Sequence, residues 1–116
     1  MSDKAETGDL GENMAAAFLE EKGYEIVARN YRFRKAEIDI IVRREDWLLF
    51  VEVKTRKSNA WGHPEKFVDA AKVKQIFLAA EEFIFSNDWN GHVRFDVVSV
   101  TLGEEPEIVH FEDAIN

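Results

Sequence analysis

The sequence predicts a mixed α/β fold in which a central β-sheet is flanked by α-helices. Three observations carry this prediction: two stretches with apolar residues at helical spacing, two adjacent strand-like runs with charges at alternating positions, and one nearly continuous apolar run later in the chain. With 116 residues, of which 46% are hydrophobic, the chain can bury one core. Residues 1–116 are therefore expected to form a single domain.

A first helix is predicted over about Gly8 to Lys22, with Gly23 as its terminator. Its main apolar stripe is expected to comprise Leu10, Met14, Ala17 and Phe18. A second stripe follows Glu12 at spacings of three, four and seven and comprises Ala15, Ala16 and Leu19. Glu12 is therefore expected to lie half-buried beside the sheet and to serve a site there, unless it is a first-turn glutamate favoured by the helix dipole.

A first strand is predicted over about Tyr24 to Phe33, and its end is basic. The aromatic residues Tyr31 and Phe33 alternate there with basic side chains, including Arg32 and Arg34. These two arginines are candidates for phosphate contacts. A solvated edge strand protected by charge has the same composition, so both interpretations stand.

The runs Ala36–Val42 and Trp47–Lys54 predict an antiparallel hairpin. Because side chains of a strand alternate between its faces, Glu37 and Asp39 are expected on one face of the first run. Glu52 and Lys54 then share one face of the second. A tight turn between the runs pairs residues whose numbers sum to 91, which places Asp39 opposite Glu52 and Glu37 opposite Lys54. Ile38, Ile40 and Val42 are expected on the other face.

The convergence of these charges indicates a divalent cation. Two carboxylates about 5 Å apart repel by roughly 3 kcal/mol at an effective dielectric constant near 20, and a bound cation removes that cost. Asp39, Glu52 and the carbonyl of Val53 offer the hard oxygen ligands that suit Mg²⁺ or Mn²⁺. Lys54 would orient the attacking water or offset charge on a phosphate. The alternative is a set of cross-strand ion pairs on a solvated face.

Asp39, a gap of twelve residues and then Glu52-Val53-Lys54 resemble the signature of the restriction-endonuclease-like nucleases, written PD-(D/E)xK. Nearly the whole chain resembles the small bacterial YraN family, also called UPF0102. The resemblance rests on an ordered set of segments: Gly8 to Glu12, Gly23-Tyr24, Arg29 to Arg32, Glu37 to Asp39, Phe50 to Arg56, Lys72 to Gln75 and Arg94 to Val98.

The resemblance implies a restriction-endonuclease-like fold and a Mg²⁺-dependent endonuclease that acts on nucleic acid, with DNA, including branched DNA, favoured over RNA. In this interpretation Asp39, Glu52 and Lys54 are catalytic, and Glu37 and Glu12 are supporting carboxylates. Junction resolvases of related fold act as dimers, so a homodimer is compatible with the resemblance.

The segment from Thr55 to Pro64 has the composition of a loop beside this site. Arg56 is a candidate nucleic-acid contact, and Trp61 can either stack on an unpaired base or close over the core. A second helix is predicted over about Asp69 to Ser86. Its expected core stripe comprises Val73, Ile76, Phe77, Ala80, Phe83 and Ile84. Three further candidates for nucleic-acid contacts lie near its start: Lys72, Lys74 and Gln75. The alternative interpretation is that they form a solvated face of the helix.

A strand is predicted over Val93 to Leu102, and its almost wholly apolar sequence indicates a central position in the sheet. A short edge strand is predicted over Glu107 to Phe111. Asp96 is expected to satisfy Arg94 or a backbone group rather than to bind metal. The three histidines, His63, His92 and His110, show no metal-ligand spacing and are assigned no role.

The net charge of -8 at first argues against nucleic acid as a partner. From Arg29 to Lys74, however, twelve Lys and Arg stand against seven Asp and Glu, so the acidic excess lies in the flanks. The chain has no cysteine, which excludes disulfides and thiolate zinc sites. Its longest apolar run, Met14 to Leu19, is too short to span a membrane, and its start is no secretion signal. A cytoplasmic location is expected.

Three functions therefore remain in view. The first is a Mg²⁺- or Mn²⁺-dependent nuclease that uses the site above. The second is a non-catalytic nucleic-acid-binding module of the same fold. The third is a protein-interaction module that uses the acidic flanks.

Overall fold

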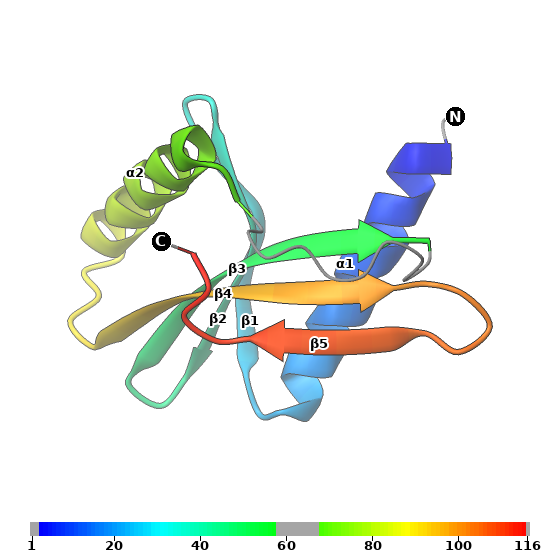
Figure 1. Cartoon of the computed structure of the whole chain (residues 1–116). Coiled ribbons are helices and arrows are strands. Elements are labelled where there is room, and N and C mark those ends of the chain that lie inside the picture. The colour runs from blue at the N-terminus through cyan, green and yellow to red at the C-terminus, as the bar shows by residue number, and fades with distance from the viewer. Residues whose placement is uncertain (1–2, 58–67, 116) are drawn as a thin grey trace.

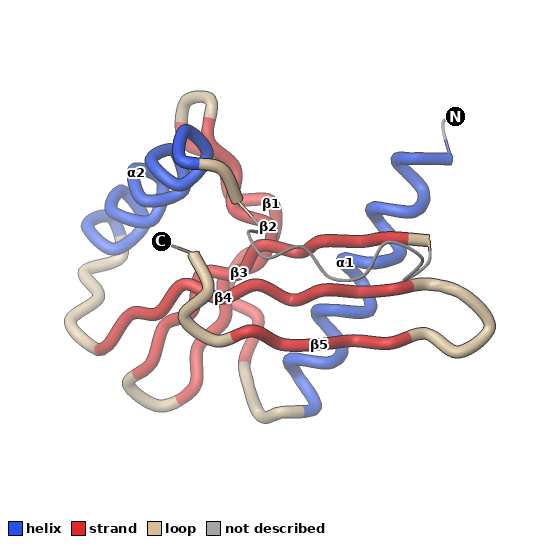
Figure 2. Tube along the Cα trace, in the orientation of Figure 1, coloured by secondary structure: helices blue, strands red, loops and turns tan. Residues whose placement is uncertain are grey.

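The structure, a computed structural model, describes residues 3–57 and 68–115, with side chains from residue 8 onward. Most of the predicted loop from Thr55 to Pro64, including Trp61 and His63, lies outside the described residues. The described residues form two helices and five strands, and Figures 1 and 2 show their arrangement. In chain order these are α1 (Asp3–Glu21), β1 (Glu25–Phe33), β2 (Ala36–Arg44), β3 (Trp47–Arg56), α2 (Ala70–Ser86), β4 (His92–Thr101) and β5 (Glu107–Phe111).

The strands form one mixed sheet in the order β1-β2-β3-β4-β5. Neighbouring strands are antiparallel except for β3 and β4, which are parallel and are joined through α2. β4 therefore lies inside the sheet and β5 at its edge, as the sequence predicts. The predicted mixed α/β class is confirmed and is consistent with a restriction-endonuclease-like fold. Neither described helix is both long and apolar enough to cross a membrane.

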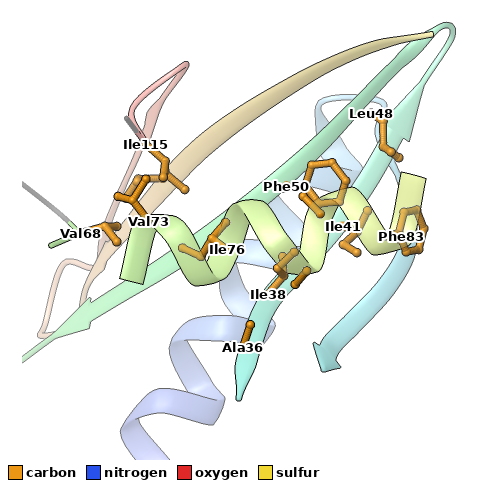
Figure 3. Close-up of a cluster of buried hydrophobic side chains, with 13 residues drawn as sticks. Ala36, Ile38, Ile41, Leu48, Phe50, Val68, Val73, Ile76, Phe83 and Ile115 are labelled. Carbon is orange, nitrogen blue, oxygen red and sulfur yellow. The ribbon is translucent and has the colours of Figure 1, made fainter. Parts of the chain in front are cut away.

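The helices cover opposite faces of the sheet. On one face, Ala15 and Leu19 of α1 pack against Leu49 and Val51 of β3. On the other, α2 packs over a cluster that includes Ile76, Phe83 and Phe50 (Figure 3). The β1–β2 hairpin extends beyond β3, and its turn lies beside the N-terminal end of α2 (Figure 1). This arrangement places the start of α2 close to the segment of β2 that carries Asp39.

The first helix begins at Asp3, five residues before the predicted start. Its predicted main stripe is only partly correct, because Met14 and Phe18 pack against the core but Leu10 and Ala17 are exposed. Leu10 is 50% exposed, whereas Ala15, Ala16 and Leu19 are buried. Small residues let α1 approach the sheet closely. Gly11 is the extreme case, because a Cβ atom at this position would overlap the side chain of Thr55 on β3. The buried stripe is the one headed by Glu12.

The predicted hairpin register is confirmed over the pairs from Ile40–Val51 to Arg44–Trp47. Beyond Ile40 the two strands cease to pair, and β2 turns as it leaves β3. As a result Ile38 packs with Phe50 on the α2 face, while Ile40 packs on the α1 face. The prediction that Ile38 and Ile40 share a face is therefore wrong, because it assumed a regular strand through Asp39.

Candidate metal and nucleic-acid site

The end of the β2–β3 pairing places Asp39 in the gap between these strands. Its Oδ2 atom accepts a hydrogen bond of 2.8 Å from the backbone N–H of Val53. The Asp39 side chain thus takes the place of a ladder partner and points towards β3, next to Glu52. The predicted register pair of Asp39 with Glu52 is wrong, because the β2–β3 pairing ends at Ile40 and Val51. The two acids still converge, since the charge of Glu52 acts on Asp39.

Two lysines approach the buried Glu52, whose side chain is only 5% exposed. The Lys72 Nζ atom of α2 lies 2.6 Å from Glu52 Oε1, and the Lys54 Nζ atom of β3 lies 3.6 Å from the same oxygen. Ser99 pairs with Lys54 in the β3–β4 register, so the two side chains leave the same face of the sheet. The buried Ser99 hydroxyl has no hydrogen-bond partner among the residues that the structure describes.

The electrostatics of the site are unbalanced at Asp39. Burial raises the pKa of Asp39, and the negative charge of Glu52 raises it further, to about 7 from an ordinary value of 3.8. The Val53 N–H and the Lys72 charge lower this pKa only in part. Burial is the largest single influence on Lys72 and lowers its pKa, but the hydrogen bond to Glu52 and the charges of Glu52 and Asp39 together outweigh it, so this pKa lies above its ordinary value. The neighbours of Asp39 therefore do not fully compensate its negative charge, whereas Glu52 has Lys72 as a close partner.

The donor chemistry of the site fits a hard divalent cation. In a strand, the N–H and C=O groups of one residue point to the same side, and the N–H of Val53 points at Asp39. The carbonyl of Val53 therefore also points towards Asp39. Asp39, Glu52 and this carbonyl would hold Mg²⁺ or Mn²⁺ with its other positions left to water and phosphate oxygens. Within residues 3–57 and 68–115, no group of three or more acidic and histidine side chains is gathered as a metal site.

A cleft of about 420 Å³ opens beside Asp39, between the β1–β2 turn and the start of α2. Among its lining residues are Lys35, Glu37, Asp39, Lys72 and Gln75. Both cationic and anionic groups therefore face a space large enough to admit part of a ligand. Of the predicted nucleic-acid contacts, Lys72 and Gln75 line this cleft.

The supporting carboxylates have other partners. Glu37 is paired with Arg32 of β1 rather than with Lys54, and its Oε2 atom lies 2.8 Å from Arg32 Nε. The predicted pair of Glu37 and Lys54 is wrong, because the β2–β3 pairing ends before it reaches Glu37. Glu37 still lines the cleft.

Glu12 approaches the same region from the α1 side. Its Oε1 atom accepts hydrogen bonds from Arg29 Nη2 at 3.1 Å and from Asn30 Nδ2 at 3.1 Å. Asn30 interrupts the regular strand with a φ of 53°, a left-handed conformation that asparagine tolerates better than most residues. The negative charge of Glu12 still contributes to the raised pKa of Asp39. Glu12 is thus near the site but already neutralised by Arg29.

The remaining predicted contacts are dispersed. Arg34 lies over the Phe33 ring and lines a second groove instead of the cleft. Lys74 is exposed on α2 and is not among the cleft residues. Arg56 is half-buried at the end of β3, where its carbonyl accepts a hydrogen bond from the Leu102 N–H. The structure does not gather the predicted basic residues into one surface around the two acids.

A second charged cluster lies on the α1 face of the sheet. It includes His110, to which no role was assigned from the sequence. As expected, Asp96 binds Arg94, with two hydrogen bonds of 2.9 Å. The Nε2 atom of His110 also lies 2.7 Å from Asp96 Oδ2, and the ammonium of Lys22 lies 2.8 Å from His110 Nδ1. Because an ammonium can only donate, Nδ1 accepts and Nε2 carries the proton. His110 therefore has a structural role, which no spacing in the sequence could indicate.

Fold and site together define a mixed α/β protein with a carboxylate and lysine site where two central strands separate. The sequence profile of the uncharacterised protein family UPF0102 matches residues 11–100, and the chain belongs to this family. The predicted family is thereby confirmed.

Relatives from distant bacteria match over nearly their full length. A UPF0102 protein of Flavobacterium psychrophilum is 44% identical over 115 residues, which cover 98% of this chain and 97% of the relative. A UPF0102 protein of Cytophaga hutchinsonii is 45% identical over 106 residues, covering 91% and 92%. A UPF0102 protein of Rhodococcus opacus is 44% identical over 111 residues, covering 92% and 93%.

Proposed function

We propose that this protein is a Mg²⁺- or Mn²⁺-dependent nuclease that hydrolyses phosphodiester bonds, with DNA as the preferred substrate. The observation that carries the proposal is the pair Asp39 and Glu52, in which burial and mutual repulsion raise the pKa of Asp39 to about 7. A divalent cation would stabilise such a pair, because it removes the repulsion between the two carboxylates.

Each residue then has a role set by its position. Asp39 and Glu52 hold the cation together with the Val53 carbonyl, and the Val53 N–H fixes the orientation of Asp39. The bound cation supplies Lewis-acid activation of water and of the phosphodiester. Lys54, on the same face as Glu52, offsets negative charge that develops on the phosphate. Lys72 and Gln75 line the approach to this position and contact the substrate backbone.

The test is a cleavage screen of the full chain over linear duplex, single-stranded and junction DNA and over RNA, with Mg²⁺, Mn²⁺ or EDTA. We expect metal-dependent cleavage that Asp39→Asn and Lys54→Ala each reduce by at least about a hundredfold. Glu20→Gln, a change at an exposed acid of α1, is the matched control and should cleave like the wild type. Full activity in either site variant would contradict the assigned roles.

A second candidate is a nucleic-acid-binding module without catalysis. It is favoured by one observation, that Lys72 already neutralises Glu52 at 2.6 Å. This candidate predicts salt-dependent binding in a gel-shift assay with no cleavage of any substrate in either metal. Binding unaffected by Asp39→Asn, together with absence of metal affinity, would favour it over the nuclease.

We also propose that the protein forms a homodimer through α2, and that it acts in the cytoplasm. A groove of about 310 Å³ lies between the β1–β2 turn and α2, lined by Phe33, Arg34, Leu78, Glu81, Glu82 and Phe85. Phe85 is 84% exposed. The basic residue of the groove comes from the β1–β2 turn and its acidic residues come from α2, so Arg34 of one copy can pair with Glu81 or Glu82 of a second copy across a twofold axis. Light scattering should give a dimer mass that Phe85→Ser reduces to the monomer mass.

A further inference from the structure

Among the described residues, Lys72 is the cation closest to Glu52, and its side chain reaches Glu52 from the rim of the cleft. Its side chain is 44% exposed, yet its Nζ atom lies 2.6 Å from an oxygen of Glu52, which is 5% exposed. Lys54, at 3.6 Å from the same oxygen, is beyond the distance of a strong charge-assisted hydrogen bond. The charge of Glu52 is therefore neutralised mainly by a side chain that reaches in from α2.

The position of Lys72 is unfavourable for the helix itself. Asp69 caps α2, and its Oδ1 atom accepts a hydrogen bond of 2.8 Å from the backbone N–H of Lys72. Lys72 thus lies in the first turn, where the helix dipole disfavours a positive charge. The first turn holds no acidic residue that would offset this cost. The capping carboxylate of Asp69 and the contact with Glu52 together compensate for the lysine at this position.

The same geometry lets the ammonium leave without disturbing the fold. The cap fixes the backbone of Lys72, so only its side chain has to rotate. The cleft of about 420 Å³ that Lys72 lines provides the space for this rotation. A long, flexible side chain that is half exposed can move between the two positions without a change of the backbone, so the cost of the move is the lost contact with Glu52.

We propose that Lys72 is a built-in counter-cation, which occupies Glu52 in the metal-free protein and is displaced into the cleft when a divalent cation binds. This inference rests on the proposed function. Lys72 therefore weakens metal binding to the free protein, and displacement delivers its charge to the cleft, where substrate phosphate would lie. Metal and substrate binding are coupled in this way, because each favours the outward position of Lys72.

The first experiment measures Mn²⁺ binding to the full chain by calorimetry, without nucleic acid. We expect Lys72→Met to tighten Mn²⁺ binding by about tenfold or more, as expected for removal of a competing charge-assisted hydrogen bond. Lys74→Met is the matched control, because it removes the same charge from an exposed position of the same helix outside the cleft. The control should change the affinity by no more than about twofold.

The second experiment uses the wild-type protein and so does not depend on the folding of the variant. Reductive methylation of lysines is followed by mass spectrometry with and without saturating Mg²⁺. The modification rate of Lys72 should rise when Mg²⁺ binds, while that of Lys74 stays constant. An unchanged rate at Lys72 would overturn the inference.

The outcomes separate this inference from the proposed function. Equal or weaker Mn²⁺ binding by Lys72→Met, with clear binding by the wild type, overturns only the role of Lys72. No binding of Mn²⁺ or Mg²⁺ by either protein overturns the metal site itself, and with it both proposals.

Discussion

Two buried acids of the same sheet, Asp96 and Asp39, have opposite electrostatic environments. Asp96 is fully buried, and burial alone would raise its pKa, but His110, Arg94 and the Asp113 N–H hold that pKa below its ordinary value. Asp39 has one backbone donor and faces Glu52, and its pKa is raised to about 7. Burial is thus common to both acids, and the number of compensating donors decides the sign of the pKa shift.

Asp96 belongs to a complete structural network, whereas Asp39 belongs to a site whose charges are not fully compensated. Every charge of the Asp96 cluster has a partner, including Arg94, which also lies 3.0 Å from Glu112. At the Asp39 site both lysines, Lys54 and Lys72, pair with Glu52, so the charge of Asp39 is less fully compensated, and the nearer of the two lysines comes from a different layer of the fold. A protein tolerates such an imbalance where a ligand supplies the missing charge.

The largest expected effect is on the completed network. Asp96→Ala should lower the free energy of unfolding by about 3–5 kcal/mol, because it leaves Arg94 and His110 without their buried partner. Urea denaturation at pH 7 measures this change. Asp39→Asn, tested in the same way without metal, should leave stability unchanged or raise it. Similar losses in the two variants would remove the distinction between the clusters.

The second prediction concerns pH, where the two acids should act in opposite directions. The raised pKa of Asp39 contributes stability that is fully present below about pH 4 and is lost as the pH rises through about 7. The lowered pKa of Asp96 contributes stability that is present above pH 4 and is lost as the pH falls below it. Asp39→Asn should therefore gain on the order of 2–4 kcal/mol relative to the wild type between pH 4 and 8.

Thermal denaturation of both proteins across this pH range, without metal, measures the difference. Saturating Mg²⁺ should abolish it by stabilising the wild type alone, since a ligand that binds only the native state raises its stability. If the stability of the wild type changes with pH in the same way as that of Asp39→Asn, the pKa of Asp39 is not raised in the folded protein.

The third prediction concerns the approach of α1 to the site. Gly11→Ala should cost about 1–3 kcal/mol, because the added methyl group overlaps the Thr55 side chain and pushes α1 away from β3. Gly8→Ala is the matched control, since a Cβ at Gly8 has no atom within 4 Å. Urea denaturation of both variants measures the effect. The Asp96 network should be preserved in Gly11→Ala, which the unchanged environment of the His110 ring in NMR spectra would verify.

The smallest effect is expected at the cap of α2. Asp69→Ala should lower stability by about 1 kcal/mol, because it removes the acceptor for the Lys72 N–H. It should also loosen the position of Lys72 above Glu52 and thereby tighten Mn²⁺ binding slightly. A loss of Mn²⁺ affinity instead would indicate that the capped position of Lys72 supports the metal.

The local elements followed from the sequence because their causes are local. Alternation and a tight turn determined the β2–β3 register from Ile40 to Arg44, and near-continuous apolar character placed Val93 to Leu102 inside the sheet. Side-chain spacing likewise identified α2, and its bounds agree with the prediction within one residue. The family was identified from an ordered set of short segments. The convergence of Asp39 and Glu52 followed from their places on neighbouring strands, although the predicted register pair does not form.

Only the tertiary structure determined the position of the irregular backbone in β2 and the contacts of the long charged side chains. The turn of β2 at Asp39, which moves Ile38 to the α2 face, depends on the separation of two strands. The contacts of Lys72 with Glu52 and of Glu12 with Arg29 join residues 20 and 17 positions apart. His110 and Asp96 come from neighbouring strands whose register no local pattern specifies. The alternation of apolar and polar residues indicates which face of a regular strand a side chain occupies. Contacts between a helix and the sheet depend instead on how closely the helix approaches the sheet, and only the packing of the whole domain determines that distance.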